Sequence, residues 1–104
     1  MVFLQNDPTG LEEVVIVDFI RMVIIDVENS KAWVDAWATL GEVYYKDSEK
    51  SKTLAFPAGV CLTVSIGGHF NGGAGYGMMM RKFGLAADHI IDAQLIDVEG
   101  RLYD

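Results

Sequence analysis

The most informative stretch of this chain is Phe56-Pro-Ala-Gly-Val-Cys-Leu-Thr-Val-Ser-Ile-Gly-Gly-His-Phe-Asn-Gly-Gly-Ala-Gly-Tyr76. It holds the single cysteine, one of the two histidines and six of the eleven glycines. Glycine can adopt positive φ and lets the backbone approach a ligand closely, at an entropic cost that packing alone rarely justifies. Exposed backbone N–H groups in such a loop also suit an anion. We therefore predict that this stretch is a glycine-rich loop laid against something flat or charged, and that it carries the function.

Composition limits the classes of protein to which the chain can belong. At 104 residues it forms at most one domain, and its 51% hydrophobic content is typical of a folded chain. The net charge of −7 and the lack of any basic cluster argue against a nucleic-acid surface. The apolar segment Val14–Ile25 is too short and too charged for a membrane span, and Met1–Pro8 shows no signal peptide. One cysteine excludes an internal disulfide.

The segments before the glycine stretch predict strands and one helix. Val14–Asp18 and Met22–Glu28 are β-branched runs whose nearly continuous apolarity indicates burial on both faces. Alternation over Lys31–Ala38 predicts a third strand. Thr39 and Glu42 have the spacing of a capping box, so we expect a helix from Thr39 to about Glu49. Leu40, Val43 and Tyr44 should form its buried side, and Glu42 is spaced to pair with Lys46.

The segments after it predict a short helix and a strand pair. Gly77–Phe83 can form a helix that Gly84 ends. His89–Val98 is expected to be a long strand that turns at Glu99-Gly100 and pairs with Arg101–Tyr103. The element order is typical of an α+β fold with small sheets, two helices and a glycine-rich loop. No glycine motif has the spacing of a Rossmann fold or a P-loop.

The residues alone leave the roles of Cys61 and His69 open. Cys61 lies among Val60, Leu62 and Val64, where a lone cysteine is usually a buried, inert hydrophobe. His69 between glycines is most simply a hydrogen-bonded structural residue. A Cys–His nucleophile pair is conceivable but matches no protease pattern. A metal site is not expected, because no second pair of ligands lies near them.

Four blocks of the sequence resemble one family closely. They are Thr39-Leu-Gly-Glu-Val-Tyr-Tyr, Glu49–Cys61 with its Phe56-Pro-Ala-Gly-Val-Cys end, Gly67-Gly-His-Phe and Gly75–Ala93. Together they resemble the berberine bridge enzyme-like proteins, plant FAD-linked oxidases of the p-cresol methylhydroxylase/vanillyl alcohol oxidase superfamily. The resemblance extends over nearly the whole chain from about Val14. Leu62 departs from it, because the family usually has proline after the attachment cysteine.

The resemblance implies a cofactor site in the glycine stretch. In the family, the cysteine that matches Cys61 bonds covalently to C6 of the isoalloxazine ring of FAD. The residue that matches His69 lies against the ribityl side and pyrimidine edge of the flavin. The cofactor-binding residues implied are Gly59, Val60, Cys61, Thr63, Val64, Gly67, Gly68, His69, Gly72, Gly73, Gly75 and Tyr76.

The resemblance also implies that residues 1–104 are part of an FAD-binding domain, incomplete at both ends. The upstream block with the second flavin-bonding histidine, the substrate domain and the catalytic base are absent, so no catalytic residue is expected here. The whole enzyme would transfer hydride from an alcohol, sugar or alkaloid substrate to FAD and then reduce O₂. Family resemblance implies a secreted or endomembrane/vacuolar location. The alternatives are a non-catalytic or antigenic fragment that does not hold flavin alone, and an unrelated glycine-loop binding protein.

Overall fold

The computed structural model describes residues 21–104, and the predicted strand Val14–Asp18 lies outside them. A hairpin opens the described part: β1 (Val23–Asp26) pairs antiparallel with β2 (Lys31–Val34), with Val23 opposite Val34 and Asp26 opposite Lys31. Asp26 closes the turn by accepting hydrogen bonds from the backbone and side chain of Asn29. Both predicted strands are confirmed, although each is shorter than its apolar run.

Helix α1 (Leu40–Lys50) begins where the capping box predicts. The Glu42 backbone N–H donates to Thr39 Oγ1 at 3.3 Å, and the Thr39 N–H donates to Glu42 Oε2 at 2.8 Å. The second bond is the main reason that the pKa of Glu42 lies below its usual value. Glu42 pairs with Arg21 rather than with Lys46 as predicted, because the capping bond turns its carboxylate toward the start of the helix.

The glycine stretch is not a loop throughout, because residues Ile66–Gly73 form helix α2. Its glycines Gly67, Gly68, Gly72 and Gly73 are therefore helical and do not use positive φ. The N-termini of α1 and α2 meet and satisfy each other's backbone. The Leu40 N–H donates to the Val64 carbonyl and the Ile66 N–H donates to the Ala38 carbonyl, both at 2.9 Å. This tertiary exchange of hydrogen bonds stabilises a helix whose glycine content predicts a loop.

The C-terminal part differs most from the prediction. Helix α3 (Met80–Phe83) ends at Gly84, whose φ of 81° confirms the predicted glycine cap. The start of the predicted strand His89–Val98 is instead the end of a 3₁₀ helix, η1 (Ala86–His89). Asp88 stabilises η1 by accepting from the Leu85 N–H at 2.9 Å. Only β3 (Leu95–Ile96) is extended in a sheet, where it pairs with β4 (Leu102–Tyr103) across the predicted turn.

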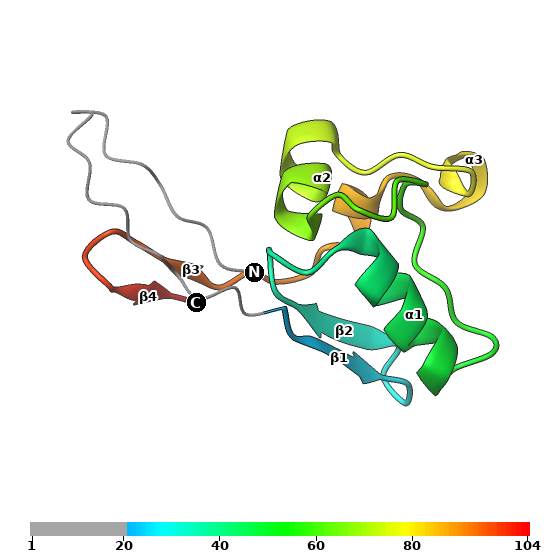
Figure 1. Cartoon of the computed structure of the whole chain (residues 1–104), viewed down its shortest axis with the longest axis horizontal. Coiled ribbons are helices and arrows are strands. Elements are labelled where there is room, and N and C mark those ends of the chain that lie inside the picture. The colour runs from blue at the N-terminus through cyan, green and yellow to red at the C-terminus, as the bar shows by residue number, and fades with distance from the viewer. Residues whose placement is uncertain (1–20) are drawn as a thin grey trace.

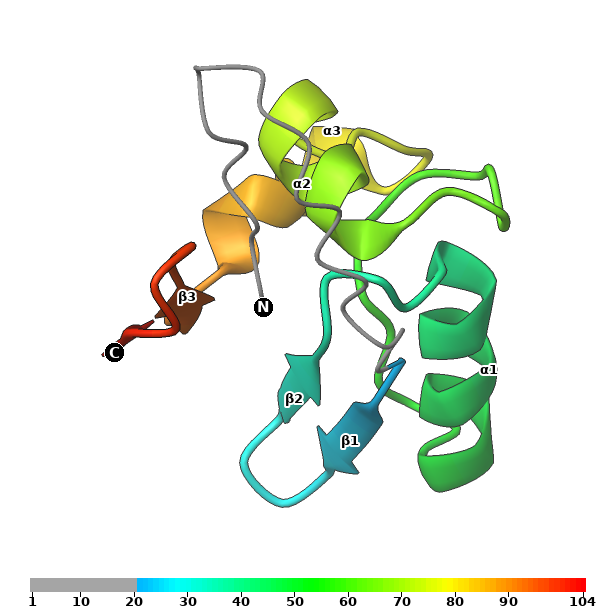
Figure 2. The same cartoon turned by 60° about the vertical axis from the view of Figure 1, so that its left-hand side comes forward.

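Figures 1 and 2 show that α1 lies along one face of the β1–β2 hairpin. They also show that α2 and η1 lie beyond the N-terminal end of α1. The β3–β4 hairpin extends away from this body. The core forms where α1, α2 and η1 meet, and its fully buried members include Leu40, Ile66 and Ala86. Burial of β1 on both faces was predicted and is wrong, because alternate residues such as Ile24 remain about half exposed. The α+β class with small sheets is confirmed.

Candidate functional site

Cys61 lies on an exposed turn between the end of the Phe56–Gly59 segment and the start of α2. Its neighbours Val60 and Leu62 are 68% and 56% exposed. The interpretation of Cys61 as a buried, inert residue is therefore wrong. Val60 and Leu62 are exposed instead of entering the core, so apolar neighbours in the sequence did not indicate that Cys61 is buried. The thiol is open to a reaction partner.

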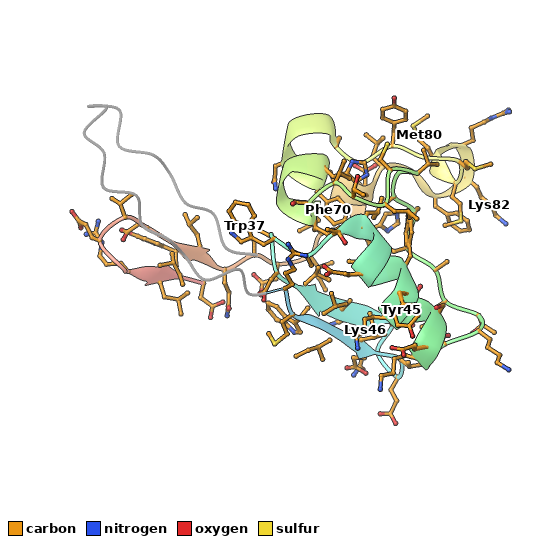
Figure 3. The ribbon with its side chains drawn as sticks, viewed as in Figure 1. Trp37, Tyr45, Lys46, Phe70, Met80 and Lys82 are labelled. Carbon is orange, nitrogen blue, oxygen red and sulfur yellow. The ribbon has the colours of Figure 1, made fainter. Side chains whose placement is uncertain are left out.

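His69 projects from α2 onto the backbone just before this turn. The Gly59 N–H donates to His69 Nε2 at 2.9 Å, so Nε2 carries no proton and the ring proton of the neutral imidazole is on Nδ1. His69 thus makes a hydrogen bond that stabilises the fold, and its predicted place in the cofactor site stays a prediction. Its ring also contacts Phe70, the buried aromatic residue of α2 that Figure 3 shows inside the fold.

Tyr44 holds the backbone on the other side of Gly59. Its hydroxyl, on α1, donates to the Gly59 carbonyl at 2.6 Å. Burial raises the pKa of Tyr44, so the hydroxyl stays protonated and remains a donor at neutral pH. Sequence reasoning placed Tyr44 only in the core. Its spacing from Gly59 carries no local signal, and the contact arises from the packing of α1 against the glycine stretch.

Three glycines are required by close internal packing. A Cβ on Gly59 would lie 2.6 Å from His69 Cε1, and one on Gly75 would lie 2.5 Å from Ala86 Cβ. Gly75 also has a φ of 70°, a backbone conformation that residues with a side chain rarely adopt. A Cβ on Gly77 would overlap the Ala58 carbonyl oxygen, although sequence reasoning did not include Gly77 in the site. The His69 ring thus occupies the space beside Gly59, whereas Ala86 and Phe70 occupy the space beside Gly75.

Three other glycines have no internal reason to lack a side chain. A Cβ on Gly68, Gly72 or Gly73 would meet nothing within 4 Å. All three are exposed residues of α2. Alanine at these positions would favour the helix. A side chain at any of these three positions would project into open space.

The structure sorts the twelve predicted cofactor residues into two groups. Gly59, Gly67 and Gly75 are buried, and His69 and Val64 are half-buried. The remaining seven are exposed: Val60, Cys61, Thr63, Gly68, Gly72, Gly73 and Tyr76. The two hollows found in the described part lie elsewhere, one between the two hairpins and one beside the C-terminal half of α1. The predicted site is thus an open surface rather than an enclosed pocket.

Figure 3 labels exposed side chains on α1 and α3, among them Tyr45 and Lys82. Tyr45 is 64% exposed, in contrast to the adjacent Tyr44, and Lys82 lies at the outer edge of the molecule over Phe83.

Residues 21–104 contain no helix with the length and apolarity that crossing a bilayer requires. In the same range, no three His, Cys, Asp or Glu residues are grouped as metal ligands would be.

Comparisons with known proteins identify the family. Residues 4–104 match the FAD binding domain family. The chain is 61% identical over 85 residues to berberine bridge enzyme-like 5 of Arabidopsis thaliana, covering 82% of this chain and 16% of the relative. It is 54% identical to berberine bridge enzyme-like 3 of the same plant, covering 93% of this chain and 19% of the relative. The chain therefore belongs to the FAD binding domain family, and its resemblance to the berberine bridge enzyme-like proteins is confirmed.

Solved structures agree with this assignment. A variant of berberine bridge enzyme superposes with a TM-score of 0.75 at 53% identity, covering 80% of this chain and 16% of that protein. The grass pollen allergen Phl p 4, which has glucose dehydrogenase activity, gives a TM-score of 0.75 at 52% identity, covering 80% of this chain and 17% of that protein. The chain thus spans about one sixth of the length of these relatives.

The described residues fit an FAD cofactor in two respects. An exposed thiol can form a bond to a cofactor, which a buried thiol cannot, and Cys61 is exposed. The open glycines Gly68, Gly72 and Gly73 leave the backbone of α2 accessible to a flat group.

Proposed function

We propose that this member of the FAD binding domain family is the cofactor-binding portion of a longer flavoprotein oxidase, in which residues 1–104 form part of the FAD-binding domain. The exposed position of Cys61 beside α2 is the observation that carries the proposal. FAD would supply a two-electron acceptor for hydride from the substrate and would pass the electrons to O₂. Support for an oxidase comes from the berberine bridge enzyme-like relatives.

Within this proposal, Cys61 attaches the flavin through a thioether to C6 of the isoalloxazine ring. The S–H bond and the ring C6–H bond are replaced by one S–C bond. This is a two-electron oxidation, for which O₂ takes up both electrons and two protons to give H₂O₂. The reactive form of a cysteine is the thiolate. The support from this chain is the exposure of the thiol.

His69 and the open glycines would bind the cofactor without a covalent bond. His69 holds its ring proton on Nδ1, because Nε2 accepts from Gly59. It is therefore a donor that can stabilise negative charge developing on the N1–C2=O side of a flavin during reduction. The exposed backbone at Gly68, Gly72 and Gly73 would lie against the cofactor. Val60, Thr63, Val64 and Tyr76 would complete the contacts around the Cys61 turn.

The proposed substrate is an alcohol, a sugar or an alkaloid, bound by parts of the longer protein. The glucose dehydrogenase activity of Phl p 4 supports a sugar, and the similarity to berberine bridge enzyme supports an alkaloid. We also propose a secreted or endomembrane/vacuolar location, for which the support is family resemblance. Cell fractionation of the tagged full-length protein tests the location.

The experiment that tests the proposed attachment is mass analysis of the denatured full-length protein. Trypsin cleaves after Lys52 and Arg81, so Cys61 lies in the peptide Thr53–Arg81. This peptide should show flavin absorbance and should carry the mass of FAD less two hydrogens, together with a second peptide wherever an upstream histidine also bonds to the flavin. The same peptide from Cys61→Ser protein should carry neither. Unmodified Thr53–Arg81 in the unaltered protein would contradict the thioether.

A second candidate is a fragment that retains the family sequence but does not hold flavin alone. The observation that favours it is the open surface around Cys61, where Val60, Cys61 and Leu62 are all exposed. Titration of residues 1–104 with FAD, followed by flavin fluorescence and equilibrium dialysis, separates the two. Retention at micromolar FAD makes residues 1–104 a self-sufficient flavin-binding unit, whereas free FAD at that concentration favours the second candidate.

A further inference from the structure

The backbone of Gly59 is held on both sides by side chains of two different helices, one at the peptide before it and one at the peptide after it. His69 of α2 accepts from its N–H at 2.9 Å, and Tyr44 of α1 donates to its carbonyl at 2.6 Å. Both backbone polar groups of one buried residue are thus satisfied by side chains, whereas most buried backbone groups are paired within helices or sheets. The His69 ring also lies so close to Gly59 that a side chain does not fit there: a Cβ on Gly59 would lie 2.6 Å from the ring.

The Cys61 turn is also fixed on its other side. The Gly41 N–H, in the first turn of α1, donates to the Leu62 carbonyl at 2.9 Å. Cys61 therefore lies between two anchored residues, Gly59 two positions before it and Leu62 one position after it. Its own carbonyl accepts a longer bond from Val64 N–H at 3.4 Å, which closes the turn. An exposed cysteine is in this way attached to both helices through its neighbours.

We propose that Tyr44 and His69 are positioning residues. Together they form a clamp, in which their hydrogen bonds fix the Gly59 backbone and thereby hold the Cys61 thiol where it bonds to the cofactor. The proposal rests on the proposed function, because a fixed thiol position matters only if Cys61 attaches the flavin. Neither side chain needs to touch the sulfur. Each acts through the backbone by reducing the number of positions that the thiol can adopt, which is the usual benefit of preorganisation.

The clamp accounts for features that the proposed cofactor contacts alone do not explain. Tyr44 is on α1 and faces the Gly59 carbonyl, while the neighbouring Tyr45 is 64% exposed. The contact of His69 Nε2 with Gly59 directs one ring nitrogen to the protein backbone rather than to a ligand. The absence of a side chain at Gly59 makes room for the His69 ring.

The clamp is tested first without flavin, on the 104-residue chain. Amide hydrogen exchange at Gly59 and ¹⁵N relaxation of residues 60–63 are measured by NMR. His69→Leu should speed Gly59 exchange about tenfold, as expected for loss of one hydrogen bond, and should increase the motion of residues 60–63. His69→Gln should restore both, because its amide oxygen can accept from Gly59. Tyr44→Phe should loosen the turn, whereas Tyr45→Phe, the matched control on the exposed side of α1, should not.

The purpose of the clamp is tested on the full-length protein. Tyr44→Phe should lower the fraction of Thr53–Arg81 peptide that carries flavin several-fold, while Tyr45→Phe should retain it, and neither residue is among the proposed cofactor contacts. Unchanged Gly59 exchange and unchanged motion of the turn in His69→Leu would overturn the clamp, even if the flavin is attached. Absence of flavin from unaltered Cys61 would overturn the attachment, even if the NMR results agree. Should His69→Leu fail to fold, Tyr44→Phe and His69→Gln decide the matter alone.

Discussion

Gly77 lies directly against the Ala58 carbonyl group, so closely that a Cβ on Gly77 would overlap the carbonyl oxygen. The contact joins the segment before α3 to the segment that carries Gly59. Ala58 itself belongs to the buried core. Both segments approach through their backbones, so neither has a flexible side chain that could move aside.

We expect Gly77→Ala to destabilise the chain by about 1–3 kcal/mol, the usual cost of overpacking a buried contact. The free energy of unfolding in urea measures this cost. Gly68→Ala is the matched control, because nothing lies within 4 Å of a Cβ at that position. Equal stability of Gly77→Ala and the unaltered chain would show that the two segments can separate without penalty.

Gly68→Ala should itself separate stability from cofactor binding. Gly68 is helical and open, so alanine should stabilise α2 by up to about 1 kcal/mol. If α2 lies against FAD as proposed, the added methyl group should weaken flavin retention by the full-length protein. The measurements are urea unfolding and flavin occupancy. A variant that is more stable and holds flavin equally well would exclude a close cofactor contact at Gly68.

Thr39→Ala should remove the side-chain half of the capping box of α1. We expect a loss of about 1 kcal/mol in the free energy of unfolding, because the Glu42 N–H loses its acceptor. Thr63→Ala, on the exposed Cys61 turn, is the matched control and should cost less than about 0.5 kcal/mol. Similar losses for both threonines would mean that the cap contributes nothing beyond a general effect of substitution.

Asp97 should make the β3–β4 hairpin sensitive to strong acid. The Arg101 backbone N–H, with smaller contributions from the Arg101 side chain and the Glu99 N–H, lowers the pKa of Asp97 to about 2. Because the folded pKa lies below the ordinary value of 3.8, its contribution is fully present above about pH 4. The contribution is lost as the pH falls through about 2.

The measurement is the intensity of the NOE between Leu95 and Tyr103, which lie opposite each other in the hairpin, as a function of pH. In the unaltered chain it should persist at pH 4 and weaken toward pH 2. Asp97→Asn should weaken it at neutral pH and leave little further change in acid, because the amide accepts these bonds less strongly than the carboxylate. A hairpin that keeps its NOE at pH 2 would show that Asp97 does not hold it.

Local chemistry was sufficient to determine several features from the sequence alone. The capping box of Thr39 and Glu42 determined the start of α1, and Gly84 determined the end of α3, because each acts within a few residues. The turn at Glu99-Gly100 likewise fixed the β3–β4 pairing. The specific blocks around Cys61 and His69 identified the family, which the comparisons confirm. The cofactor role of each site residue remains a prediction.

Only the tertiary structure decided the conformation of the glycine stretch and the exposure of Cys61. Glycine-rich residues 66–73 form a helix because the N-terminus of α2 exchanges hydrogen bonds with that of α1, across 26 residues between Leu40 and Ile66. Such a bond has no local sequence signal. For the same reason, the hydrogen bonds of Tyr44 and His69 to Gly59 could not be predicted from the sequence, because they form only when the fold brings three distant segments together. Propensity describes what a residue favours alone, whereas packing decides which backbone groups find partners.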